Sequence, residues 1–250
     1  MSKYQREVLR QGQTSPLSLG DYAIAEIRDL YHSLGRPLRI LDIGSGSGAQ
    51  MDRIVRHCGE HAFSQRVGLD WSVEAVNRLK TSTIYNQVKL CQSSELPFDN
   101  GEFDIAISIE NLEHLYASDV LPAIREMMRV ADKIVIITPH PRDVVNLGWL
   151  RNEISATIRD REVLNAEDYQ MLEGAVHKSV VVPSTMATAG FKLGAGDHGR
   201  YSASSAAVDL DQIEVIGINA SDAEPLERKY LNLLKASLAL DSRLNHVRNL

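Results

Sequence analysis

The sequence predicts an α/β fold, in which a parallel β-sheet carries helices on both faces. Short apolar runs alternate with helical stretches from about residue 38 to residue 140. The first of these runs, residues 39–43, leads directly into a glycine-rich segment, which is typical of a tight turn from a strand into a helix. With 250 residues, 44% of them hydrophobic, the chain can bury one sizeable core. We therefore expect a single domain over residues 1–250.

The glycine-rich segment predicts a nucleotide-type binding site. Residues 39–48 are RILDIGSGSG, an apolar strand followed by a glycine at every second position. Glycine lets the backbone approach a ligand closely, because any Cβ there would intrude. The helix that follows, from about Ala49, is expected to aim its free N–H groups at the same ligand. We assign the ligand contacts of this turn to Asp42, Gly44, Ser45, Gly46 and Gly48.

The spacing of the glycines indicates which nucleotide is bound. A dinucleotide fingerprint, G-x-G-x-x-G, would need glycine at position 47 or 49, where the chain has serine and alanine. A phosphate-binding P-loop would need Gly-Lys-Ser/Thr, which the chain lacks. The spacing G-x-G-x-G, with Asp42 two residues before the first glycine, instead resembles the first motif of the class I S-adenosylmethionine (SAM)-dependent methyltransferases.

A second apolar run strengthens the resemblance. Residues 66–70, RVGLD, end in Asp70, 26 residues after Gly44. An acid at the tip of the second strand can accept hydrogen bonds from ribose hydroxyls. In the resembled family the matching acid binds both hydroxyls of the SAM ribose, and the next residue, here Trp71, lies near the adenine.

Further blocks follow in the family's order. Residues 92–99, QSSELPFD, and residues 103–108, FDIAIS, resemble the polar adenine contact, the Leu-Pro-Phe block and the fourth strand. The usual adenine contact is Asp or Asn, so Gln92 or Ser93 would take that place here. The resemblance covers about residues 38–140. It implies a Rossmann-like class I methyltransferase fold, with a mostly parallel seven-stranded sheet, helices on both faces and an antiparallel last strand.

The resemblance also implies an organisation along the chain. We expect an N-terminal helix that covers the cofactor, the SAM-binding core, an insertion that shapes the acceptor pocket, and a last segment with two strands and an amphipathic helix. These are residues 17–35, 38–140, 141–190 and 191–250, with the two strands at 191–193 and 212–218 and the helix at 224–240. That helix offers either a homodimer face or a lid on the sheet.

A cluster of potential metal ligands follows the fourth strand. Residues 110–114 are ENLEH; if they are helical, positions 110, 113 and 114 lie on one face. Two carboxylates so close together are costly unless a positive charge compensates them. Carboxylate oxygens with one or two imidazoles suit Mg²⁺, Mn²⁺ or Fe²⁺.

The sequence pattern E-x-x-E-H resembles the metal-binding motif of two methyltransferase groups. One contains the ubiquinone-biosynthesis O-methyltransferases, and the other the small-RNA 3′-terminal 2′-O-methyltransferases. The RNA group adds a histidine from a His-Lys pair, and this chain has His177-Lys178 in the comparable place. The resemblance implies that Mg²⁺ or Mn²⁺ is held by Glu110, Glu113, His114 and His177.

Other roles for these residues stay open. Many relatives carry Leu-Glu-His-Leu without a metal, where the acid and the histidine only pin a loop over the cofactor. We also assign Glu110 to the cofactor site, and His114 and His140 as candidate catalytic bases.

The predicted function is SAM-dependent O-methylation of a small-molecule hydroxyl in a diol, sugar or catechol, with a divalent metal as an additional feature. The alternatives are a metal-independent N- or C-methyltransferase, an RNA 3′-end 2′-O-methyltransferase, an NAD-dependent oxidoreductase, and an inactive binding module on the same fold.

Composition narrows the class of partner and the location. The net charge of −6 and a pI near 5.8 argue against a broad nucleic-acid surface. No apolar run reaches membrane-spanning length, and the first residues lack the apolar core of a signal peptide. Cys58 and Cys91 are not spaced as a metal pair. We therefore expect a cytoplasmic protein that acts on a small molecule.

Overall fold

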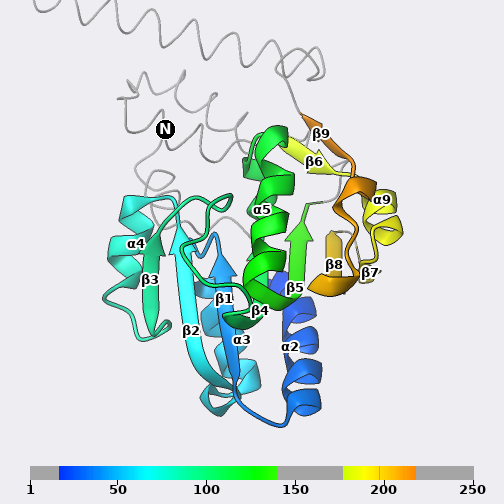
Figure 1. The fold of residues 1–250 in the computed structure, drawn as a ribbon. Helices are drawn as coiled ribbons and strands as arrows, with labels where there is room; N and C mark the ends of the chain where they lie inside the picture. Colours follow the sequence, from blue (N-terminus) through cyan, green and yellow to red (C-terminus); the bar gives the residue numbers. More distant parts are fainter. Residues whose placement is uncertain (1–16, 140–176, 197, 218–250) are drawn as a thin grey trace, which may run out of the picture.

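The computed structural model of this chain describes residues 17–139, 177–196 and 198–217. Its main sheet has seven strands in the order β3-β2-β1-β4-β5-β8-β7 (Figure 1). Neighbouring strands run parallel except β8, which is antiparallel to both β5 and β7. The predicted mostly parallel seven-stranded sheet with an antiparallel last strand is confirmed. The bounds are β1 Leu38–Ile43, β2 Phe63–Asp70, β3 Gln87–Leu90, β4 Phe103–Ile109, β5 Ala131–Thr138, β7 Lys192–Leu193 and β8 Gly199–Ser204.

Helices cover both faces of this sheet. Helices α2 and α3 lie on one face and α5 on the other (Figure 1). Strand β1 shows why both faces must be covered, because Ile40 packs in the cluster under α2 and α3 while Leu41 packs in the cluster under α5. Central parallel strands that are buried on both sides are nearly continuous apolar runs, as the sequence has here. The bounds are α2 Gly20–Leu34, α3 Ala49–Cys58, α4 Val73–Leu79, α5 Ala117–Val130 and α9 Pro183–Thr188.

The strand order places the ligand-binding edge. The chain passes from β1 outward to β2 and β3, and then returns to β4 on the other side of β1. In open α/β sheets, ligands bind beyond the carboxyl ends of the strands at such a reversal. The segments that leave β1, β2 and β4 therefore meet at the functional edge.

The last strands differ from the expectation. Residues 215–217 form β9 (Val215–Gly217), which pairs with β6 (Ser179–Val181) in a separate two-stranded antiparallel sheet. The prediction that residues 212–218 complete the main sheet was therefore wrong, and the antiparallel strand is β8, which we had not predicted. The pattern along one strand indicates burial of its faces but not its partner, so it cannot assign a strand to a sheet.

Other expectations fall partly outside the described residues. The helix predicted from residue 17 is α2, preceded by a 3₁₀ turn, and it ends at Gly35 as expected, with φ of 63°. The helix predicted at 224–240 and residues 140–176 of the insertion lie outside the described residues. Among the described helices, none has the length and apolar character needed to cross a membrane. The cytoplasmic location stays a prediction.

Candidate functional site at the carboxyl edge of the sheet

The glycine-rich turn after β1 is anchored to the end of β2. Gly44, Gly46 and Gly48 have φ angles of 76°, 52° and 79°, the left-handed region that favours glycine. The amides of Gly44 and Ser45 both donate to the carbonyl of Leu69, at 3.0 and 2.9 Å, and the Ser45 hydroxyl donates to the same carbonyl at 3.1 Å. The turn is thus a fixed loop whose conformation depends on glycine.

Asp70, at the end of β2, joins the glycine-rich turn to the next loop. Its carboxylate accepts hydrogen bonds from the amides of Gly46, at 2.8 Å, and Ser72, at 2.9 Å. Burial raises the pKa of Asp70, and these two amides oppose the rise. A carboxylate has about four acceptor positions, so ribose hydroxyls can donate to Asp70 beside these amides. Trp71, which follows, is 53% exposed, so part of its ring surface is accessible.

The remaining predicted cofactor residues lie at the same edge. Asp42 is buried near the end of β1, and Gln92 and Ser93 follow β3, with Gln92 exposed and Ser93 buried. These residues fit a nucleoside ligand. The Asp70 carboxylate can accept from ribose hydroxyls and the exposed Gln92 side chain can bond to a base, and both lie with the glycine-rich turn beyond the ends of β1, β2 and β3.

Three potential metal ligands converge near this turn. One ligand atom from each of Glu113, His114 and His177 lies within 4.8 Å of the other two. The Glu113 side chain is buried, and neither carboxylate oxygen accepts a hydrogen bond from the described part of the chain. His114 Nε2 lies 3.7 Å from Glu113 Oε1. A buried carboxylate that accepts no hydrogen bond from the described residues and lies beside two imidazoles fits a site for a divalent cation.

The local backbone differs from the helix that the motif suggested. Residues Leu112–His114 form a single 3₁₀ turn, η3, and Glu110 before it has φ of 52°, which is uncommon for a residue with a Cβ. Desolvation raises the pKa of Glu113 well above its usual range, and the nearby charge of Glu110 adds to the rise. Glu110 is thus close to Glu113 but is not one of the three residues whose ligand atoms converge.

His177 reaches this place because β6 is anchored to η3. The amide of Lys178 donates to the Glu113 carbonyl at 2.7 Å, and its Nζ donates to the His114 carbonyl at 3.1 Å. The Ser179 hydroxyl donates to the Leu112 carbonyl at 3.3 Å. His177 was predicted from the sequence, but its anchoring by the two residues after it was not. His140 lies outside the described residues, so its role as a base stays a prediction.

The metal-ligand cluster and the glycine-rich turn are in contact. The Asn111 side chain packs against Gly44 so closely that a Cβ at Gly44 would lie 2.5 Å from Asn111 Cγ. The Asn111 amide also donates to the hydroxyl of Ser108, in β4, at 3.2 Å. The turn that carries Glu113 and His114 therefore begins at the wall of the predicted cofactor site.

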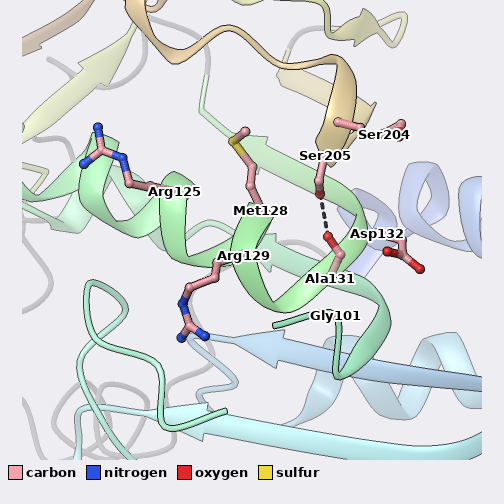
Figure 2. A pocket seen from close by; sticks show the side chains of 9 residues that line it. Gly101, Arg125, Met128, Arg129, Ala131, Asp132, Ser204 and Ser205 are labelled. Atoms are coloured by element: carbon pink, nitrogen blue, oxygen red, sulfur yellow. Dashed lines mark hydrogen bonds between the residues drawn. The ribbon is translucent and has the colours of Figure 1, made fainter. Parts of the chain in front are cut away.

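A pocket of about 630 Å³ lies at the opposite edge of the sheet (Figure 2). Gly101 precedes β4, Ala131 begins β5 and Ser204 ends the antiparallel β8, so these residues mark the amino-terminal edge. The pocket is therefore not part of the candidate site. It is lined by Gly101, Arg125, Met128, Arg129, Ala131, Asp132, Ser204, Ser205 and Ala206.

One comparison with known proteins matches part of the core. A family model described as a methyltransferase domain matches residues 40–133, which run from β1 into β5. Within residues 40–133, the chain is therefore similar to a methyltransferase domain. The match covers the glycine-rich turn, Asp70 and the ENLEH segment, but not His177. No curated protein matches the chain by sequence.

Solved structures similar to this chain include proteins described as methyltransferases. One is a putative methyltransferase of Haloferax volcanii in complex with the Trm112 activator, with 18% identity, a TM-score of 0.40, and coverage of 54% of this chain and 65% of that one. Another is a putative sarcosine dimethylglycine methyltransferase from Galdieria sulphuraria, with 18% identity, a TM-score of 0.41, and coverage of 53% and 56%. The chain thus spans less than two thirds of either protein.

A third similar structure is magnesium protoporphyrin IX methyltransferase from Synechocystis PCC 6803 with bound S-adenosylhomocysteine (SAH). It has 13% identity and a TM-score of 0.46, with coverage of 80% of this chain and 93% of that one.

Proposed function

We propose that this protein transfers the methyl group of SAM to a hydroxyl oxygen of a small molecule, such as a diol, a sugar or a catechol, next to a divalent cation. The observation that carries the proposal is the convergence of Glu113, His114 and His177 within 4.8 Å. The same segment contacts the glycine-rich turn through Asn111 and Gly44. A cation site in contact with a SAM site suits activation of an oxygen acceptor.

The residues of the chain act mainly by positioning. The methyl group of SAM is already activated by the sulfonium, so holding the acceptor oxygen in line with it supplies much of the rate. Asp70 accepts hydrogen bonds from the ribose, the glycine-rich turn lets the cofactor approach the backbone, and Trp71 offers a ring surface to the adenine. Gln92 or Ser93 contacts the adenine edge.

Glu113, His114 and His177, with Glu110 as a fourth candidate, are the residues that would hold Mg²⁺ or Mn²⁺. When bound, such a cation supplies Lewis-acid chemistry that lowers the pKa of a substrate hydroxyl. The anchoring of η3 by Lys178 keeps the two histidines side by side, with ring centroids 5.0 Å apart. His114 serves as a base in the metal-independent alternative, and His140 in either case.

The test is methyl transfer to a panel of catechols, sugars and diols with labelled SAM, in Mn²⁺ and in excess EDTA. We expect transfer in Mn²⁺ and none in EDTA. His114→Ala should lose both bound Mn²⁺ and activity, whereas His57→Ala, in the exposed part of α3, should keep both. Full activity in EDTA would contradict the metal and favour a metal-independent N- or C-methyltransferase.

RNA 3′-end methylation is the narrower alternative, suggested by the His177-Lys178 pair. The net charge of −6 speaks against it. A gel shift of small RNA that weakens with salt would support it.

For the oxidoreductase alternative, we expect that a titration with a nicotinamide cofactor shows no binding, since neither the glycine spacing nor the family match supports an oxidoreductase. The homodimer stays a prediction, which sedimentation can test.

A further inference from the structure

Tyr85 is a buried tyrosine whose hydroxyl reaches the predicted cofactor site. It lies in the loop between α4 and β3, and only 6% of it is exposed. Its hydroxyl donates a hydrogen bond to Asp42 Oδ2 at 2.5 Å. Asp42, which is 4% exposed, stands at the end of β1 directly before the glycine-rich turn. Two residues 43 positions apart are thus joined by a short hydrogen bond under that turn.

The backbone makes room for the tyrosine ring. A Cβ at Gly68, in the middle of β2, would lie 3.0 Å from the ring. A Cβ at Gly48, in the glycine-rich turn, would lie 3.4 Å from the ring and 2.9 Å from Leu79 Cδ2. Glycine in the interior of a strand weakens that strand and often marks close approach by another group. The ring therefore occupies a fitted slot between β2 and the turn.

We propose that Tyr85 is a positioning residue for the cofactor, which fixes the Asp42 carboxylate before the glycine-rich turn so that its negative charge favours the cationic amino group that SAM and SAH share. The inference rests on the proposed function, because it concerns the same cofactor site. It assigns a role to Tyr85 that is separate from direct contact with the cofactor.

The electrostatics of the pair agree with this role. Burial raises the pKa of Asp42 to about 7, the charge of Asp70 adds to the rise, and the Tyr85 hydroxyl opposes it. Burial and the charges of Asp42 and Asp70 raise the pKa of Tyr85 well above its usual range, against a smaller effect of the Ser45 hydroxyl. Tyr85 therefore stays protonated and can donate. If the Tyr85 hydroxyl were removed, the Asp42 carboxyl group would keep its proton to higher pH.

The experiment is calorimetric titration with SAH, which carries a cationic amino group, between about pH 6 and 8.5. It compares the wild type with Tyr85→Phe and with Tyr31→Phe, a control in the last turns of α2 near the opposite edge of the sheet. Wild-type affinity should fall as the pH drops through about 7. In Tyr85→Phe the midpoint should rise by about one pH unit, so that affinity at pH 7.5 falls roughly threefold. Tyr31→Phe should follow the wild type.

A folded Tyr85→Phe variant with an unshifted midpoint would overturn the inference. If that variant does not fold, Asp42→Asn gives the second test, because its amide oxygen can still accept from Tyr85 but cannot ionise. Affinity that no longer changes around pH 7 in Asp42→Asn would support the inference, and a retained midpoint would overturn it. Wild type that binds no SAH at any pH would remove the proposed function as well, whereas an unshifted midpoint removes only the inference.

Discussion

Replacing Glu113 by glutamine should stabilise the metal-free protein. Both oxygens of this buried carboxylate lack a hydrogen bond from the described residues, and the charge of Glu110 lies nearby. A buried polar group without a partner costs about 1–3 kcal/mol of folding free energy. The amide is neutral at every pH, so it avoids the cost of burying or protonating the carboxyl group, and it can donate to Glu110; we expect a gain of about 1–2 kcal/mol. For a chain of this size, that corresponds to a rise of about 2–8 °C in Tm.

Metal should reverse the order of stability. A ligand at a hundred times its Kd stabilises the folded state by about 2.7 kcal/mol. Mn²⁺ should therefore raise the Tm of the wild type above that of Glu113→Gln, which has lost a ligand. The assay is thermal unfolding of both proteins in EDTA and in excess Mn²⁺.

Glu26 provides the matched control. It is as deeply buried as Glu113, but Lys133 and Lys192 contact its carboxylate at 2.6 and 2.9 Å. Glu26→Gln removes the negative charge that faces the two lysines, so it should lower the Tm in EDTA and in Mn²⁺ alike. The reasoning about the cation site is refuted if Glu113→Gln also melts below the wild type in EDTA. It is also refuted if Mn²⁺ raises the Tm of Glu113→Gln as much as it raises the Tm of the wild type.

Three further changes test other parts of the structure. Two arginines hold the pKa of the buried Asp104 well below its usual range, so its stabilisation is present above about pH 4 and lost as the pH falls further. In urea, Asp104→Asn should be about 2 kcal/mol less stable than the wild type at pH 7, with a smaller difference at pH 3; an equal difference at both would contradict this. Lys178→Met removes the hydrogen bond to the His114 carbonyl, so kcat should fall about tenfold while the Kd for SAH stays unchanged; a changed Kd with normal kcat would argue against a role in positioning η3. Gly44→Ala places a Cβ against Asn111 at a position with a left-handed φ, so SAH binding should be lost while the protein still unfolds cooperatively. Normal SAH binding by this variant would show that the turn is not the cofactor site.

The parts of the fold that the sequence predicted are those set by local backbone chemistry. Glycine at 44, 46 and 48 can take positive φ without strain, and all three do. The run from residue 38 to 43 is apolar enough for burial on both faces, and it forms the interior strand β1, between β2 and β4. The helix predicted to stop at Gly35 does end there, with Gly35 in the left-handed conformation.

The features that were missed depend on contacts between distant segments. The sequence of β9 is compatible with either sheet, and only its pairing with β6 decides its place. The φ of 52° at Glu110 has no sequence signal, because Asn, Asp and Gly are the usual residues in that region. Tyr85 could have been suspected from Gly68, a glycine inside an apolar strand, although the glycine alone does not say which side chain approaches it.

The central claim is a SAM site with a cation site in contact with it, and one calorimetric experiment tests both parts. SAH is titrated into the protein in EDTA, and Mn²⁺ is then titrated into the metal-free protein and into Glu113→Gln. The account predicts micromolar binding of SAH and a heat of Mn²⁺ binding that the variant lacks. Absence of SAH binding would contradict the assignment of the glycine-rich turn, and equal Mn²⁺ heats in both proteins would contradict the cation site.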